Sequence, residues 1–171
     1  PRSTLFPYTT LFRSKAAAIL EKVFAEQPQH PGVAHYLIHS YDFPPIADKG
    51  LNAAQRYASI APAAPHAQHM PSHIFTRVGA WTESVSTNAR SAEAAKRDND
   101  FDEYLHSMDY MVYGELQMAR DDDARQVVAA ASGTFTTARN AGPYAQAAIP
   151  ARYAVERSDW KQAMTLEPRQ S

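Results

Sequence analysis

The sequence contains no cysteine, which excludes several chemistries at once. Disulfides, zinc sites with thiolate ligands, iron–sulfur clusters and thiol nucleophiles all require that residue. Glycine is also scarce, with six in 171 residues, and none of them belongs to a phosphate-binding glycine loop. Any ligand chemistry must therefore rely on other side chains.

The chain has neither a strong charge nor a long apolar run. The 17 basic and 18 acidic residues give a net charge of −1, so no global field attracts nucleic acid or an anionic membrane. No apolar run reaches the about 18 residues of a transmembrane helix. An apolar fraction of 44% over 171 residues suffices for one domain with a hydrophobic core. The compartment stays open, because proteins without cysteine occur on both sides of membranes.

From about Lys15 onward the sequence is rich in alanine, and its apolar residues recur at helical spacing. Proline and glycine divide this pattern into segments joined by short turns. No strand is expected, since the β-prone residues 134–137 lie inside a helical pattern. We expect helices at about 15–28, 31–43, 46–60, 66–79 and 82–96, a sixth around 105–116, a seventh opening at 121–123, an eighth after residues 142–143, and a ninth from about 159.

Three helix–turn–helix junctions align with one another, at residues 77–84, 117–124 and 156–163. The equivalent turn positions are Gly79, Ala119 and Ser158, and each is followed by a small residue on the next helix: Ser84, Ala124 and Ala163. These junctions resemble the turn of a tetratricopeptide (TPR) hairpin. The resemblance covers roughly residues 33–166 and implies an all-α, TPR-like α-solenoid of antiparallel helical hairpins. The junctions are 40 and 39 residues apart, against a TPR period of about 34, so a generic α-solenoid stays open.

Residues 30–39 (HPGVAHYLIH) and 65–75 (PHAQHMPSHIF) resemble a group of bacterial TPR-containing proteins. The resemblance implies helical repeats on both sides of this region but no particular activity. We therefore expect the repeat domain, residues 15–171, to be truncated at both ends. Residues 4–14 (TLFPYTTLFRS) resemble one translated frame of a sequencing adaptor, so residues 1–14 are expected to be artefactual or disordered.

Histidines gather on two of the predicted helices. Spacings of three and four residues place side chains on one helical face. If both helices are first helices of consecutive hairpins, they pack side by side and their stripes face one groove. His106, on the next first helix, would join the edge of that groove. The two stripes are His35, His39 and Asp42, and His66, His69 and His73.

The stripes have three possible interpretations. Paired histidines can ligate zinc or another divalent metal through neutral imidazole nitrogens. The histidines can instead be hydrogen-bonded packing residues, or polar contacts for a bound peptide. Residue 36 is tyrosine, so the His-Glu-x-x-His pattern of a metallopeptidase is absent. The metal set would be His35, His39, His69, His73 and Asp42, and the groove would add His66, His106 and Tyr36.

The sequence therefore predicts a scaffold that binds a protein or peptide through a concave helical groove, and not an enzyme. The alternative is a metal-binding protein or a metal-dependent hydrolase that uses the histidines. A third hypothesis is that the chain is the structural middle of a longer solenoid and has no function of its own. Neither a nucleic-acid partner nor membrane insertion is expected.

Overall fold

The computed structural model describes residues 5–133, 139 and 141–167. Within these ranges the protein is all-α and contains no strand, which confirms the all-α part of the expected fold. The β-prone residues 134–137 lie outside the described residues. Among the helices that are described, none is long and apolar enough to cross a membrane.

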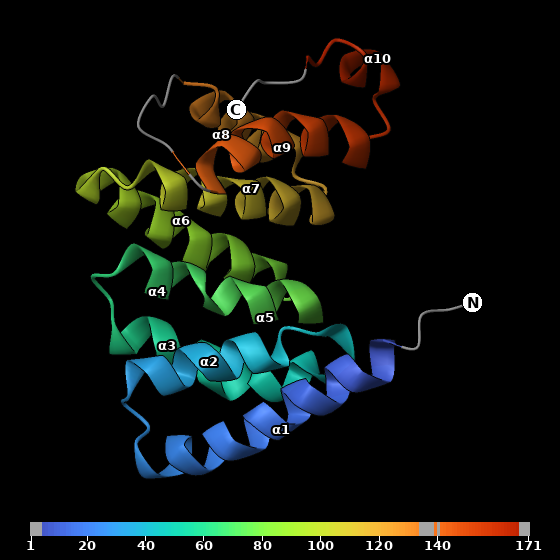
Figure 1. The fold of residues 1–171 in the computed structure, drawn as a ribbon. Helices are drawn as coiled ribbons and strands as arrows, with labels where there is room; N and C mark the ends of the chain where they lie inside the picture. Colours follow the sequence, from blue (N-terminus) through green and yellow to red (C-terminus); the bar gives the residue numbers. More distant parts are fainter. Residues whose placement is uncertain (1–4, 134–138, 140, 168–171) are drawn as a thin grey trace.

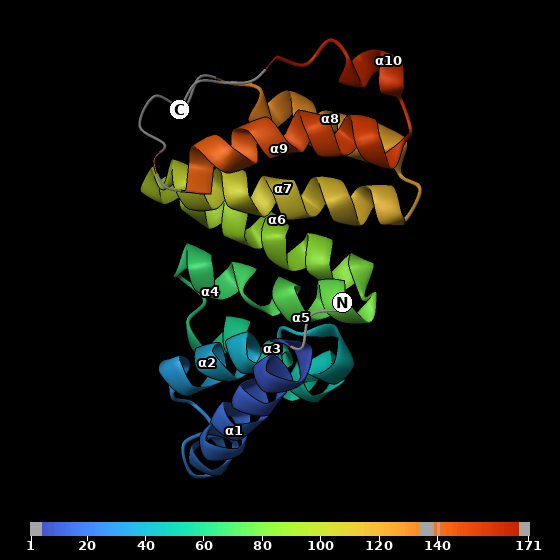
Figure 2. The ribbon, with the colours of Figure 1, turned by 45° about the vertical axis from the view of Figure 1, so that its right-hand side comes forward.

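The helices follow one another in a single stack, from α1 at one end to α10 at the other (Figure 1). Helix α1 packs on α2, α6 on α7 and α7 on α8, whereas α4 packs chiefly on α6 and α9 packs chiefly on α7. Helix α2 also contacts α5, and α4 contacts α7. Figure 2 shows the same order after a 45° turn. The elements are α1 (Leu5–Glu26), α2 (Pro31–Tyr41), a 3-10 helix (Pro44–Gly50), α3 (Leu51–Ile60), α4 (Pro65–His69), α5 (Pro71–Val78), α6 (Trp81–Asp98), α7 (Phe101–Gln117), α8 (Asp121–Ala131), α9 (Ala141–Glu156) and α10 (Trp160–Ala163).

Helix α1 begins at Leu5, inside the segment 1–14 that was expected to be artefactual or disordered. Its Arg13 donates a hydrogen bond to the carbonyl oxygen of His39 at 2.6 Å, which places this part of α1 against α2. The artefactual origin of residues 1–14 stays a prediction, because a helical conformation does not reveal where a segment comes from.

Prolines account for most differences between the predicted and observed helices. The predicted helix 66–79 is split into α4 and α5, because Pro71 has no N–H to donate within the helix. The predicted helix 46–60 starts instead with the 3-10 turn Pro44–Gly50. Pro143 was expected to lie before a helix but occupies the first turn of α9, where a missing N–H costs nothing.

The interior contains two separate apolar clusters. One is built from α1 to α5 and centres on Leu37, Ile38 and Ile74, and the other is built from α6 to α9 around Leu105 and Ile149. Each of these five side chains is at most 1% exposed, so both clusters have a dry centre. The two clusters meet where α6 packs on α4 and α5.

The layer between the clusters is polar. Helix α6 turns buried serine and asparagine side chains toward α4 and α5, and each has a partner there. We call this layer the polar seam. Its pairs are Ser84 Oγ with Thr76 Oγ1 at 2.9 Å, Asn88 Oδ1 with His69 Nδ1 at 2.7 Å, and Ser91 Oγ with the Pro65 carbonyl oxygen at 2.8 Å.

Four turns share one backbone geometry. The three positions aligned from the sequence have left-handed φ angles of 77° at Gly79, 57° at Ala119 and 54° at Ser158, and Asn99 adds a fourth at 57°. After each of them, an N–H bonds to the carbonyl five residues back, as in a Schellman turn. These bonds are Ala80 to Phe75, Asp100 to Ala95, Arg120 to Glu115 and Asp159 to Ala154. The equivalence of the three junctions is thereby confirmed at the level of the backbone.

Replacing Ala119 by glycine should raise the free energy of unfolding by about 0.5–1 kcal/mol, because a Cβ at positive φ is disfavoured and glycine is not. Ala89, exposed in the interior of α6, is the control. Ala89→Gly should lower the free energy of unfolding by about 0.5–1 kcal/mol. Chemical denaturation measures both values, and a loss of stability in both variants would contradict the turn geometry.

Candidate metal centre

Six histidine rings from α2, α4, α5 and α7 form one connected group. Neighbouring ring centroids are separated by 4.4 Å for His69–His106 and up to 6.0 Å for His39–His73. The two stripes expected from the sequence therefore lie side by side. The seventh histidine, His30, lies apart, and its Nδ1 caps α2 by accepting from the Val33 N–H. We call the group the histidine cluster: His35, His39, His66, His69, His73 and His106.

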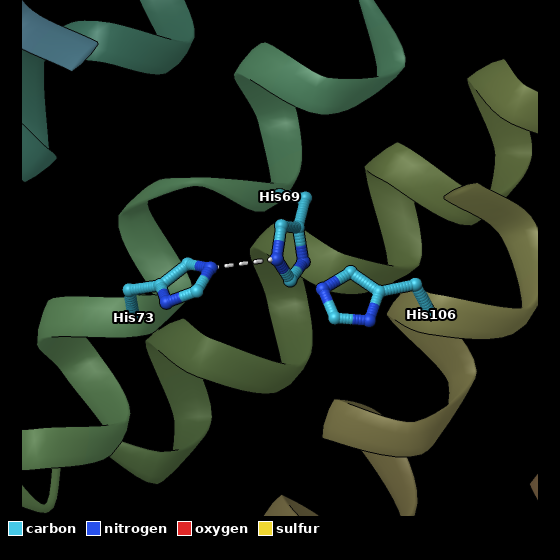
Figure 3. A group of neighbouring side chains, drawn as sticks. All are labelled: His69, His73 and His106. Atoms are coloured by element: carbon cyan, nitrogen blue, oxygen red, sulfur yellow. Dashed lines mark hydrogen bonds between the residues drawn. The ribbon is translucent and has the colours of Figure 1, made fainter. Parts of the chain in front are cut away.

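Three members of the cluster bring their ring nitrogens together. His69, His73 and His106 each offer one nitrogen, and these nitrogens lie within 4.8 Å of one another. Figure 3 shows His69 between His73 and His106. They come from α4, α5 and α7 respectively, so three helices meet here. His69 is fully buried and the other two are partly buried. We call this group the three-histidine site.

Asn88 orients the His69 ring. The Asn88 Nδ2 donates to the Ser84 carbonyl oxygen at 2.8 Å, so its Oδ1 faces His69 Nδ1 at 2.7 Å. An amide oxygen only accepts hydrogen bonds, so His69 Nδ1 carries the proton. In the neutral ring the lone pair is then on Nε2. Asn88 and His69 are both fully buried, so neither can exchange this bond for one to water.

Asp42 orients the His73 ring in the same way. Burial disfavours the Asp42 carboxylate, but hydrogen bonds from His73 and Arg77 outweigh burial and lower its pKa to about 2. The ionised Asp42 accepts from His73 Nδ1 at 3.0 Å and from Arg77 Nε at 2.7 Å. His73 therefore also presents its Nε2 away from its partner, toward His69.

The two Nε2 atoms of His69 and His73 face each other at 3.0 Å. Two lone pairs repel, so a positive species has to lie between these nitrogens. A proton is one such species and a metal ion is the other. Zinc–nitrogen bonds of about 2.0–2.1 Å at a tetrahedral angle place two ligand nitrogens about 3.3 Å apart, close to the distance observed.

Most rings of the cluster favour the neutral form that ligates metals. Burial lowers the pKa of His69 well below its usual value and also lowers the pKa of His106. Burial, followed by the charges of neighbouring histidines, lowers the pKa of His35 to about 4. His66 differs, because its hydrogen bond to the Glu103 carboxylate, 3.0 Å away, raises its pKa.

The four histidines predicted as ligands form two pairs. His35 Nε2 and His39 Nε2 are 2.8 Å apart on α2, and the Tyr57 hydroxyl lies 3.3 Å from His35 Nδ1. This pair meets the three-histidine site through the 6.0 Å ring contact of His39 with His73. Asp42, predicted as a carboxylate ligand, takes the position of a hydrogen-bond acceptor behind His73.

The three residues expected to line a groove lie at different places relative to the histidine cluster. His106 belongs to the three-histidine site. His66 lies at the rim of the histidine cluster, bound to Glu103. Tyr36 is 63% exposed and touches the cluster only by its ring, 5.5 Å from that of His35.

Three residues of the site were not singled out from the sequence. No spacing pattern in the sequence marks Asn88, since it is one polar residue in a helix of small residues. A spacing pattern does mark Glu103 and Tyr110. On α7 they repeat, together with His106, the spacing of three and four residues seen in the two histidine stripes. The Tyr110 hydroxyl lies 3.4 Å from His73 Nδ1, and its ring centroid is 4.9 Å from that of His69.

A pocket of about 290 Å³ opens beside the three-histidine site. His73 and His106 form part of its wall, whereas the buried His69 does not line it. Two ion pairs and three tyrosines complete much of the lining. These are Asp42 with Arg77, Asp109 with Arg152, and Tyr110, Tyr113 and Tyr144.

No protein-family model, curated protein or solved structure matches this chain. The TPR resemblance, drawn from the aligned turns, therefore stays a prediction. The geometry of the histidine cluster is the feature of the chain that points to a function.

Lowering the pH from about 7 to 4 should destabilise the metal-free protein. An unfolded His35 takes up a proton near its ordinary pKa of 6.5, but the folded one does so only near 4. The contribution of His35 to the free energy of unfolding is fully present above pH 6.5 and is lost as the pH falls to 4. His69 and His106 shift in the same direction, and His66 in the opposite one.

Urea denaturation across this pH range measures the effect. His35→Gln, which cannot titrate, should show a shallower decline in the free energy of unfolding than the unaltered protein. A free energy that stays level down to pH 4 would contradict the neutral, buried state of these rings.

Proposed function

We propose that this protein binds a divalent transition metal at the three-histidine site. The supporting observation is the pair of facing Nε2 atoms of His69 and His73, 3.0 Å apart. Asn88 and Asp42 each accept the Nδ1 proton of one ring, so both lone pairs are aimed at one point. Ligating histidines are typically held this way, with the second ring nitrogen bonded to a carboxylate or carbonyl oxygen.

The donor set indicates which metals fit. His69, His73 and His106 supply three imidazole nitrogens, and imidazole suits zinc, copper, nickel and cobalt. Magnesium and calcium prefer oxygen ligands and are disfavoured here. Three protein ligands leave one position of a tetrahedral metal for water or another molecule. We propose binding only, and assign no catalytic step.

Metal binding should compete with protons. A metal between His69 and His73 displaces the proton that otherwise separates their nitrogens. Affinity should therefore fall with decreasing pH, as it does for metal sites whose ligands must be deprotonated. The low pKa of buried His69 keeps that ring available down to mildly acidic pH.

Protein purified without a histidine tag should bind about one equivalent of zinc or cobalt, measured by elemental analysis after dialysis. Asp42→Asn, which removes the charge of the group that accepts from both His73 and Arg77, should weaken binding about 10–100-fold. His106→Gln removes a ligand and should weaken it further. His30→Asn is the matched control, since it changes a histidine outside the cluster and keeps a capping side chain.

Less than about a tenth of an equivalent of metal, together with no thermal shift on adding zinc, nickel or copper, would refute the proposal. Equal losses of affinity in His106→Gln and His30→Asn would place any bound metal outside the three-histidine site.

We also propose, as a second role, that the chain is a TPR-like α-solenoid that binds a protein or peptide. Support comes from the common geometry of the turns at Gly79, Asn99, Ala119 and Ser158, and from the contacts of α2 with α5, α4 with α7, and α7 with α9. Stacked hairpins of this kind present extended binding surfaces.

A peptide array probed with the metal-free and the metal-loaded protein tests this second role. We expect saturable binding of a subset of peptides, because a groove of fixed shape selects among sequences. Uniform weak binding, or none, would contradict it and would leave the metal proposal untouched.

A further inference from the structure

The open side of the three-histidine site is the pocket of about 290 Å³. His73 and His106 lie in the pocket wall, whereas the fully buried His69 is not part of the lining. A metal held by these three nitrogens therefore has its remaining coordination position directed into the pocket. A molecule in the pocket can bind the metal directly.

The charges around the pocket favour an anion. Asp42 pairs with Arg77 at 2.7 Å, and Asp109 pairs with Arg152 through two contacts at 2.8 and 3.0 Å. These four side chains cancel one another. Three neutral imidazoles add no negative charge. The Glu103 carboxylate, 4.0 Å from His69 Nδ1, is hydrogen-bonded to His66 and offsets only part of the two positive charges of a divalent metal. An anionic fourth ligand offsets them best.

The hydrogen bonds of Arg77 and Arg152 indicate which kind of anion the pocket can bind. Binding phosphate typically takes a guanidinium fork aimed at its oxygens. Here Arg152 already directs Nε and one terminal nitrogen at Asp109, and Arg77 directs Nε at Asp42. The metal and the Tyr110 hydroxyl, 3.4 Å from His73 Nδ1, can together hold an anion. Two such groups match the two oxygens of a carboxylate.

The rest of the pocket suits a flat apolar body. Tyr110, Tyr113 and Tyr144 contribute three aromatic rings to its lining. The ring of Tyr113 is held by Arg152 at 5.3 Å and by an edge contact with Trp81 at 5.6 Å. A volume of about 290 Å³ is at the small end of ligand pockets, about 300–1,000 Å³.

We propose that the pocket binds a small aromatic carboxylate, whose carboxylate takes the open position of the metal while its ring packs among the tyrosines. This inference rests on the proposed metal site. It names the chemistry of the fourth ligand, which the three histidines alone do not determine.

Cobalt-loaded protein tests the proposal, because the visible absorption of Co²⁺ reports its coordination. Cobalt loading is measured first, and benzoate, acetate and inorganic phosphate are then titrated separately. Benzoate should change the cobalt spectrum and bind at least about 10-fold more tightly than acetate, since only benzoate gains ring packing. Phosphate should bind more weakly than benzoate.

Tyr144→Leu and Tyr36→Leu form a matched pair, because both tyrosines are largely exposed, at 70% and 63%, and only Tyr144 lines the pocket. Tyr144→Leu should lower benzoate affinity about 5-fold and leave acetate affinity unchanged. Tyr36→Leu should change neither.

Cobalt that binds but whose spectrum does not respond to benzoate would overturn this inference and leave the metal site standing. Equal affinities for benzoate and acetate, or tighter binding of phosphate, would overturn it as well. Failure of cobalt to bind at all would overturn both proposals.

Discussion

The boundary between the two apolar clusters is made of buried polar groups, and each of them needs a partner. Asn88 lies at its centre and bonds to the Ser84 carbonyl through one end of its amide and to His69 through the other. Leaving either end unpaired would cost about 1–3 kcal/mol. The packing of α6 on α4 therefore dictates the orientation of the His69 ring. The candidate site is for this reason a part of how the helices are held together.

Local patterns in the sequence predicted what depends on nearby residues. The three-and-four spacing placed the histidines on common helical faces, and alternation of first and second helices predicted that the two stripes would meet. Small residues at three aligned junctions predicted equivalent turns, which the left-handed backbone at Gly79, Ala119 and Ser158 confirms. Neighbouring residues determine the helical faces and the turns, and the order of the hairpins determines which faces meet.

Contacts between distant residues escaped prediction. His69 bonds to Asn88 19 positions away, and Asp42, predicted as a metal ligand beside His73, instead accepts a hydrogen bond from His73 31 positions away. The break between α4 and α5 sets the direction of His73 relative to His69, and a continuous helix was expected there. His106 was assigned to the edge of a groove, because nothing in its own surroundings shows how closely α7 approaches α4. Such pairings follow from helix packing, which periodicity alone does not give.

The three histidines lie on both sides of the polar seam, since α4 and α5 belong to one apolar cluster and α7 to the other. Stacked helices often open in separate cooperative units, each with its own stability. A cation bound by all three rings would crosslink the two halves without adding to either core. Its main effect would be to make the halves open together, so occupancy would control the cooperativity of the stack more than the strength of any one part.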